Sequence, residues 1–305
     1  MGDMVEMLAS ALRMTMPVLI TALGAIYSER SGVTNIGLEG MMLTGCFWGA
    51  YGALHYGPFA GIFVAIFAAM LMALIHAFVT VTYRVDQIVS GVAINILAYG
   101  LSRFFSITLY GMATTSPHVE SLSKISIPVL KDIDFLHPLT ADMSPIIIVG
   151  LLLVLLTYWV LERTVFGLRL KSVGENPLAA DTLGVKVLWY RYAGVLISGA
   201  FAGLAGAYLA IEHTGMYVEG MTQGKGYIAL AAMIFGNWRP YGALGAACLF
   251  GFAEALSLRV VQNKMIPYQF IKMLPYILTL FVLAGVVRKA QPPASVGLPY
   301  SREEK

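Results

Sequence analysis

The feature that constrains this chain most is a long stretch without charged residues. No Asp, Glu, Lys or Arg occurs from Met41 to Tyr83, and the histidines within that stretch are His55 and His76. About 20 apolar residues are enough for a helix to cross a lipid bilayer. The stretch is therefore long enough for two crossings, and we expect an integral membrane protein.

The composition of the whole chain supports the same conclusion. Hydrophobic residues make up 58% of the 305 residues and charged residues 12%, with a mean hydropathy of +0.75. A soluble domain has about 25% charged residues, so these values exclude ordinary soluble enzymes, disordered chains and nucleic-acid binders. Cys46 and Cys248 lie in apolar stretches without metal-ligand spacing, so we expect no metal site. The sequence predicts an all-α polytopic membrane protein.

Nine apolar segments follow one another along the chain. They are Ala9–Tyr27, Ile36–Leu54, Phe59–Thr82, Ile88–Leu109, Pro145–Leu161, Tyr192–Ile211, Tyr227–Asn237, Tyr241–Leu258 and Ile271–Val287. The Tyr227–Asn237 segment is too short to span the hydrocarbon core as a helix. We interpret it as one arm of a broken helix, a feature that marks translocation paths. We expect about 8–10 transmembrane or half-membrane helices in a single domain of residues 1–305.

Two hydrophilic connections predict how the chain is oriented. Gly111–Ser144 has more acidic than basic residues, whereas Glu162–Arg191 has more basic ones. Short basic loops stay in the cytoplasm, so we place the second connection inside and the first outside. Arg84 then also lies inside, and so does Arg288–Lys289, provided that the short segment Tyr227–Asn237 belongs to a complete crossing. The helices that start near Ala9 and Tyr192 run in opposite directions under this assignment, as expected of two inverted repeats.

The segment Ser28–Met42 contains a candidate site, in which Asn35 is a possible N-cap for a helix and Glu39 then lies in its first turn. A carboxylate at that place is stabilised by free amides and by the positive helix end. Two explanations of Glu39 are equally good. Either Glu39 is only a favourable charge in a first turn, or Asn35 and Glu39 face a polar cavity, because charges at membrane depth seldom face lipid.

A short helix is predicted inside the basic connection. Asn176 is a good N-cap, Pro177 suits the first helical position and Gly184 suits the stop, which gives a helix over Pro177–Leu183. A helix of two turns cannot hold itself together. It is typical of a knob that docks into a groove of another protein, and the alternative is a surface helix that packs on its own bundle.

Three further polar residues are candidates for a translocation path. Gln223 and Lys225 precede the short apolar segment, where they face either the permeant or solvent, and Asn95 lies in the middle of another segment. Asn95 is explained by a hydrogen bond to a neighbouring helix or by a place in the path. The GMTQGKG run is not a phosphate-binding loop, because that motif requires Gly at Glu219 and Ser or Thr at Gly226. No catalytic constellation is found.

Three motifs, in the same order and spread over nearly the whole chain, resemble a known family. ERSGVTNIGLEGMMLTG, VGENPLAADTLGVKV and GKGYIALAAMIFGNWRPYGALGA are similar to segments of the permease subunits of bacterial ABC importers in the branched-chain amino acid, ribose and nucleoside group. The nucleoside and simple-sugar permeases resemble the chain most. The resemblance implies ATPase coupling through Gly174, Glu175, Asn176, Pro177, Leu178, Ala179, Ala180, Leu183 and Gly184.

The resemblance also implies the partners. A second related permease subunit, a cytoplasmic ABC ATPase and an extracytoplasmic substrate-binding protein or lipoprotein complete such importers in the bacterial inner membrane. ATP and Mg²⁺ are used by the ATPase, and this chain is expected to bind no cofactor and no nucleic acid.

The resulting hypothesis is a transport subunit without a catalytic site. It forms half of a path for a small polar solute, which we expect to be a nucleoside. The alternatives are the same architecture for ribose, simple sugars or branched-chain amino acids, and a secondary transporter or channel that acts alone. The predicted docking helix argues against a lone carrier.

Overall fold

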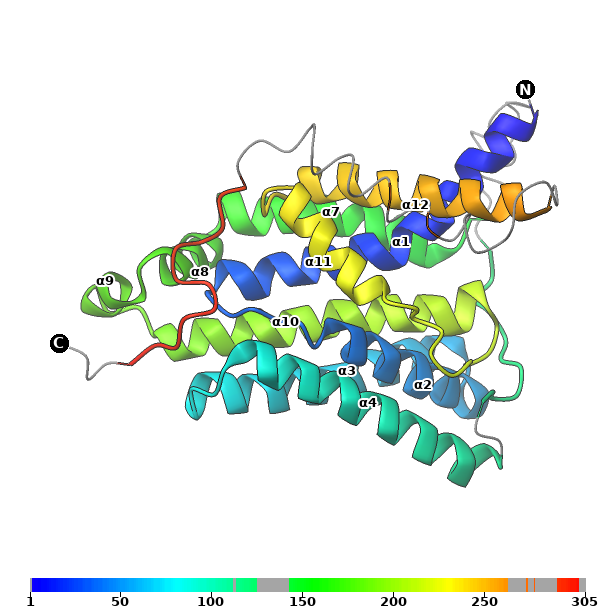
Figure 1. Cartoon of the computed structure of the whole chain (residues 1–305), viewed down its shortest axis with the longest axis horizontal. Coiled ribbons are helices and arrows are strands. Elements are labelled where there is room, and N and C mark those ends of the chain that lie inside the picture. Colours follow the sequence, from blue (N-terminus) through cyan, green and yellow to red (C-terminus); the bar gives the residue numbers. More distant parts are fainter. Residues whose placement is uncertain are drawn as a thin grey trace.

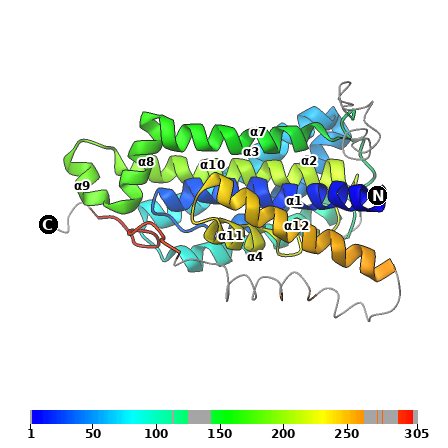
Figure 2. The same ribbon diagram turned by 90° about the horizontal axis from the view of Figure 1, so that it is seen from above.

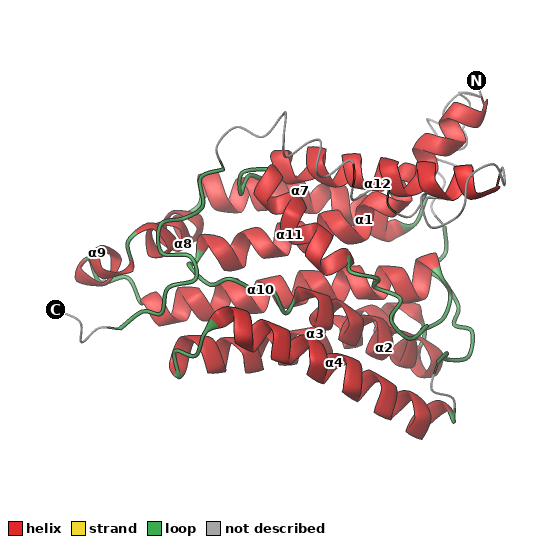
Figure 3. Cartoon of the chain, viewed as in Figure 1, coloured by secondary structure: helices red, strands yellow, loops and turns green. Residues whose placement is uncertain are grey.

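The structure is a computed structural model that describes residues 2–111, 114–124, 143–262 and 290–301, together with 273 and 277. Helices account for nearly all regular structure in these residues (Figure 3). In chain order they are α1 (Gly2–Arg30), α2 (Leu38–Tyr56), α3 (Pro58–Ala77), α4 (Gln87–Tyr110), α7 (Pro145–Arg163), α8 (Val165–Glu175), α9 (Pro177–Thr182), α10 (Val187–Ala207), α11 (Lys225–Phe235) and α12 (Pro240–Gln262). The π-helical turns η1 (Phe78–Thr82) and η2 (Tyr208–His213) extend α3 and α10.

Six helices of the described part are long and apolar enough to cross a membrane. They correspond to α1, α3 with η1, α4, α7, α10 with η2, and α12. Two more helices at membrane level, α2 and α11, begin inside the bundle. The prediction of an all-α polytopic membrane protein is confirmed. The predicted segment Ile271–Val287 lies outside the described residues except for positions 273 and 277.

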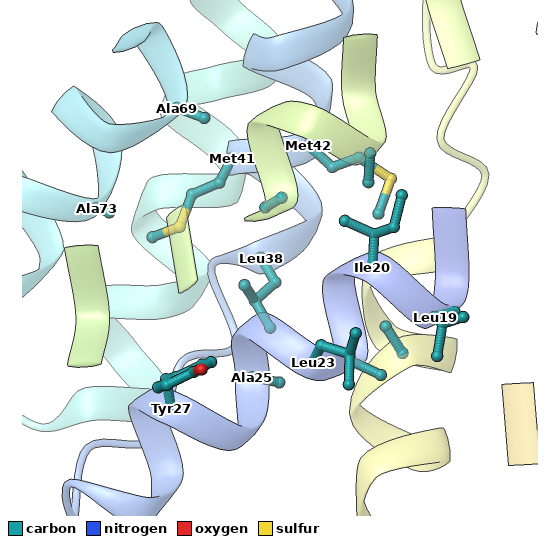
Figure 4. Close-up of a cluster of buried hydrophobic side chains, with 14 of the residues drawn as sticks. Leu19, Ile20, Leu23, Ala25, Tyr27, Leu38, Met41, Met42, Ala69 and Ala73 are labelled. Carbon is teal, nitrogen blue, oxygen red and sulfur yellow. The ribbon is translucent and has the colours of Figure 1, made fainter. Parts of the chain in front are cut away.

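The helices separate into a central and a peripheral group. In the most apolar windows of α1 and α10, 78% and 72% of the residues are buried, against 28–33% in α3, α4, α7 and α12. Leu19, Ile20 and Leu23 of α1 pack near Leu38 and Met42 of α2 in the buried centre (Figure 4). The peripheral helices therefore supply the surface that lipid or another subunit covers.

Small residues on α10 let its neighbours approach closely. A Cβ atom on Gly199 or Gly203 would collide with α3, and one on Gly206 would collide with the α2 backbone. Close packing of this kind drives helix association in a membrane, where lipid tails are as apolar as the side chains. On the other side of α3, Phe59, Phe63 and Phe67 are exposed at four-residue spacing, which gives a continuous apolar ridge.

The helices α1 and α10 run in opposite directions (Figures 1 and 2). We call the end of the bundle that carries α8 and α9 the α9 end. Arg30, the last residue of α1, lies there and pairs with Glu175 at 3.9 Å. Farther from the α9 end, the Tyr208 hydroxyl of η2, which follows α10, donates to the Arg13 carbonyl of α1 at 3.1 Å. The antiparallel relation agrees with the predicted inverted repeats.

The two broken elements are also antiparallel. After α1 the chain turns back into the bundle, and α2 starts there and runs away from the α9 end, whereas α11 runs toward it (Figure 1). The end of α11 is placed by Trp238, whose carbonyl accepts from Arg30 at 3.3 Å. The starts of α2 and α11 therefore lie close together in the interior.

The two hydrophilic connections lie at opposite ends of the bundle, as far as they are described. Thr82, just before Arg84, is hydrogen-bonded to Tyr192 near the α9 end. The start of the Gly111–Ser144 connection lies at the opposite end, where the Leu122 amide donates to Glu212 at 2.7 Å. Residues 125–142 and Arg288–Lys289 lie outside the described residues.

Candidate functional site

A carboxylate from another helix holds the start of α11. The residue before α11, Gly224, is left-handed and offers no side-chain cap. Glu39, in the first turn of α2, accepts hydrogen bonds from the Gly224 amide at 2.8 Å, the Gly226 amide at 2.7 Å and the Thr222 hydroxyl at 2.6 Å. Amides in a first turn have no partner in their own helix, and the positive helix end favours a negative charge. Glu39 therefore joins α2 to α11.

Gly226 permits this junction. A Cβ atom at this position would lie 2.5 Å from the Glu39 backbone nitrogen and 2.6 Å from its Cα. Any side chain would therefore push the start of α11 away from the start of α2 and lengthen the hydrogen bonds to the carboxylate.

The start of α2 is held in turn by α4. Gly37 precedes α2 and has no side-chain cap, and the Asn95 Oδ1 accepts instead from the Gly40 amide at 2.7 Å. The Asn95 Nδ2 donates to the Ile36 carbonyl at 3.1 Å. Because the broken segment leaves these backbone groups without helix partners, Asn95 satisfies them. The expected hydrogen bond of Asn95 to a neighbouring helix is confirmed.

The sequence interpretation of Asn35 is wrong, because α2 begins at Leu38, two residues beyond the position that Asn35 would cap. The Asn35 side chain is fully buried and donates to the Ser198 hydroxyl of α10 at 2.8 Å. It therefore ties α2 to α10 and does not face the surface. Glu39 does lie in the first turn of its helix, as predicted, but its oxygens bind the amides at the start of α11.

Lys225 lies at the start of the short helix, as expected, and faces inward. It is 8% exposed, and its ammonium group lies 2.7 Å from Glu254 of α12. The interpretation as a solvated loop residue is wrong for Lys225, since so little of it reaches solvent. The pairing also gives Glu254, a carboxylate within α12, a partner across a helix interface. The pair connects α11 to α12.

An exposed polar face surrounds this junction. We call Asn95, Tyr99, Arg103, Glu219, Gln223 and Tyr227 the polar face. The Asn95 Nδ2 donates to the Tyr227 hydroxyl at 2.9 Å, and Arg103 pairs with Glu219 at 3.5 Å. Tyr99 and Tyr227 are 46% and 47% exposed. Polar groups of two helices therefore reach one surface at membrane depth.

The sequence contains a signal for the polar face that becomes visible only when three residues of one segment are considered together. Asn95, Tyr99 and Arg103 are four residues apart, a spacing that places them on one side of a helix. Arg103 alone is explained as a side chain that reaches to the membrane surface. Its partner Glu219 lies in an irregular segment far away in the sequence, so the pair required the tertiary structure.

The predicted docking helix is present at the α9 end. The Asn176 Oδ1 accepts from the Ala179 amide at 3.0 Å, Pro177 takes the first position, and Gly184 follows the helix with φ +81°. The helix ends at Thr182, one residue before the predicted end. Leu178 and Leu183 are 47% and 84% exposed. Two apolar side chains therefore project from α9.

Ala180 differs from the expectation that it contributes to a docking surface. It is 3% exposed and belongs to the buried core of the chain. In so short a helix one side must pack against the protein that carries it, and Ala180 lies on that side. The outward surface of α9 is formed by Leu178, Ala179 and Leu183.

These elements define a class of protein. Membrane-length helices surround two antiparallel broken elements, α2 and α11, whose starts are capped by side chains of other helices beside a polar face. A small helix projects from one end of the bundle. This is the architecture of a multi-pass transport protein, with irregular backbone at membrane depth only where protein groups satisfy it. The chain belongs to the family described as "Branched-chain amino acid transport system / permease component", which matches residues 7–283.

Relatives support the family over the full length. The chain is 41% identical to the guanosine ABC transporter permease protein NupQ of Bacillus subtilis, over 99% of this chain and 100% of the relative. It is 35% identical to the nucleoside ABC transporter permease protein NupC of Lactococcus lactis, over 97% and 96%. It is also 32% identical to a putative glucose ABC transporter permease protein, TsgC13, of Haloferax volcanii, over 94% of each chain.

Proposed function

We propose that this chain forms half of the translocation path of an ATP-driven nucleoside importer. The observation that carries the proposal is the polar face, which lies beside the starts of α2 and α11. The guanosine and nucleoside names of two relatives favour nucleosides among polar solutes. The proposed role is transport, without bond chemistry in this chain.

The charges around the polar face fit an uncharged solute. Arg103 is paired with Glu219, Lys225 is paired with Glu254, and the Glu39 carboxylate is occupied by two amides and a hydroxyl. The exposed groups that remain for a permeant include the rings of Tyr99 and Tyr227 and the amide of Gln223. Aromatic rings stack on flat ring systems such as nucleobases, and amides pair with their polar edges.

The substrate is tested by uptake in cells that lack other nucleoside transporters. Expression of this chain with its ATPase, second permease and binding protein should give ATP-dependent uptake of guanosine. Ribose, glucose and leucine are assayed in parallel. Uptake of ribose or glucose alone would favour the sugar alternative suggested by the glucose relative, and uptake without an ATPase would favour a lone transporter.

The proposed ATPase contact is the outward surface of α9. Leu178 and Leu183 are the large apolar side chains that project there, and apolar anchors of this kind dominate binding when they enter a pocket. In this proposal the ATPase holds ATP and Mg²⁺. A second permease covers the polar face, and a binding protein delivers the solute at the end opposite α9.

The docking contact is tested by co-purification. Leu183→Arg should reduce the ATPase recovered with the permease by about tenfold, because a charge replaces an anchor at the contact. Leu168→Arg, at a 66% exposed leucine of α8, is the matched control and should retain the ATPase. Equal recovery with both variants would show that α9 is not the docking helix.

The proposed orientation places the α9 end in the cytoplasm of a cell whose inner membrane holds the protein. Single cysteines at Ser172 and Ser121, in a variant without Cys46 and Cys248, should react with an impermeant maleimide from opposite sides. Labelling of Ser172→Cys from outside the cell would reverse the proposed orientation.

A further inference from the structure

We infer that residues 290–301, which we call the strap, link the docking helix α9 to the short helix α11, so that a movement of α9 reaches the polar face. The strap runs along the α9 end as an irregular segment (red in Figure 1). This inference rests on the proposed role of α9 as the ATPase contact, and it assigns a coupling role to residues outside both the polar face and α9.

The middle of the strap is fixed to the last turn of α8, which leads directly into α9. The Ser295 amide donates to the Gly174 carbonyl at 2.9 Å, and the Ser295 hydroxyl lies 2.7 Å from the same oxygen and 3.2 Å from the Val173 carbonyl. The Ala294 amide donates to the Glu175 carboxylate at 3.3 Å. Since Glu175 directly precedes the cap residue Asn176, the strap holds the entry to α9.

The last residues of the strap are fixed to α10. The Arg191 side chain is 1% exposed and donates through Nη1 to the Leu298 carbonyl at 2.9 Å. Its guanidinium carbon lies 5.8 Å from the centre of the Tyr300 ring, within the range of a cation–π contact. A buried arginine without such partners would be costly. Arg191 therefore holds the strap beside α9.

The first residues of the strap reach the end of α11. The Gln291 amide donates to the Asn237 Oδ1 at 3.0 Å, and Asn237 lies two residues beyond α11. The next residue, Trp238, donates from its indole to Glu29 of α1 at 2.6 Å. Asn237 and Trp238 both have left-handed backbone conformations, with φ +53°. The turn that the strap contacts therefore has a well-defined backbone conformation.

These contacts form one route from the ATPase contact to the polar face. Hydrogen bonds join the strap to the last turn of α8 through Ala294 and Ser295, and to Asn237 beyond α11 through Gln291. The backbone of the strap connects these two attachments. The other end of α11 bears Lys225 and Tyr227 and is capped by Glu39. Because α11 has 11 residues, a shift at Asn237 displaces the whole helix more readily than it would displace a full membrane span.

The route passes through side chains that can be removed without touching α9 or the polar face. Ser295→Ala removes the hydroxyl contacts with the last turn of α8. Asn237→Gly removes the oxygen that accepts from the Gln291 amide, while glycine preserves the left-handed backbone. Asn237→Asp keeps an acceptor oxygen and serves as the conservative variant. Ser172→Ala is the matched control for Ser295→Ala, since the Ser172 hydroxyl bonds within α8 at the Arg169 carbonyl.

The experiment uses the complete transporter in proteoliposomes, with Tyr227→Cys as a reporter in a Cys248→Ser background. The rate of maleimide labelling at the reporter is measured with and without ATP and vanadate, and ATP hydrolysis is measured in the same samples. The parent should change its labelling rate by about tenfold on ATP binding, as for a coupling energy of ordinary size. Ser172→Ala and Asn237→Asp should retain this change.

Ser295→Ala and Asn237→Gly should lose most of the change while the ATPase remains bound and hydrolyses ATP. A full labelling response in both variants would overturn the inference, and so would loss of the ATPase from the complex, because the strap would then serve docking. These outcomes are separate from failure of the proposed function, in which the parent itself shows no response to ATP.

Discussion

Two short α-helices of the described chain, α9 and α11, are stabilised at their starts in opposite ways. The six-residue α9 carries its own cap, since the Asn176 side chain binds the Ala179 amide three residues later. The start of α11 has no cap of its own and receives the Glu39 carboxylate from a position 187 residues away from Gly226. One helix is specified locally and the other by tertiary structure.

The difference follows from the surroundings of the two helices. Several residues of α9 are exposed, so water can satisfy free backbone groups there and a single side-chain cap is enough. At membrane depth no water is available to free amides, and each must find a protein partner. The start of α11 therefore depends on a carboxylate with two oxygens, which satisfies two amides and a hydroxyl together.

The largest expected effect comes from Glu39. Glu39→Leu leaves the Thr222 hydroxyl and the amides of Gly224 and Gly226 without their acceptor, at a cost of more than about 3 kcal/mol. Glu39→Gln keeps one acceptor oxygen and should remain mostly folded. Folded protein is measured by gel filtration after detergent extraction, together with uptake.

The control for this substitution is Glu6→Leu, which removes an exposed carboxylate paired with Arg259 at 3.4 Å. Such surface pairs contribute little to stability, so the folded fraction should stay near that of the parent. Wild-type folding and uptake by Glu39→Leu would show that α11 does not depend on this cap.

The next effect concerns the link between α11 and α12. Lys225→Met leaves the partly buried Glu254 carboxylate without its cation, which should destabilise the protein by about 2 kcal/mol. The double variant Lys225→Met with Glu254→Gln should regain much of this loss, because no unpaired charge remains. The melting temperature of the purified protein in detergent measures both, and a double variant no better than the single one would contradict the pairing.

The smallest effect is expected at the locally specified helix. Asn176→Ala removes the cap of α9 and should cost about 1 kcal/mol locally, with membrane insertion and overall melting unchanged. Asn176→Asp retains a capping oxygen and should behave like the parent. Proteolysis at the α9 end reports the loosening, and equal protection of the three proteins would mean that tertiary contacts alone hold α9.

Most of the fold could be predicted from the chain itself. Charge-free apolar segments predicted the membrane helices, because a bilayer imposes a minimum length and excludes charge. The short segment at Tyr227 was correctly interpreted as a half-length helix. Asn176, Pro177 and Gly184 predicted α9 to within one residue, since capping acts over three or four positions along the chain.

The candidate site was less predictable, because its contacts join residues far apart in sequence. Asn35 matched the preference for a cap, yet it is buried against Ser198. Ala180 seemed suited by its size to an outward contact, and only the packing of α9 on the bundle shows that it faces inward. Residue type and local spacing carry no information about which side of a short helix is covered.

The sequence by itself determined a chain of membrane helices, the broken element near Tyr227 and the small capped helix inside the basic connection. The reason is that length, hydropathy and local capping are properties of neighbouring residues. Only the tertiary structure decided that Glu39 caps α11, that Asn95 caps α2 and that the strap joins α9 to α11. The physical reason is that a free amide at membrane depth donates to any suitable oxygen that packing brings within reach.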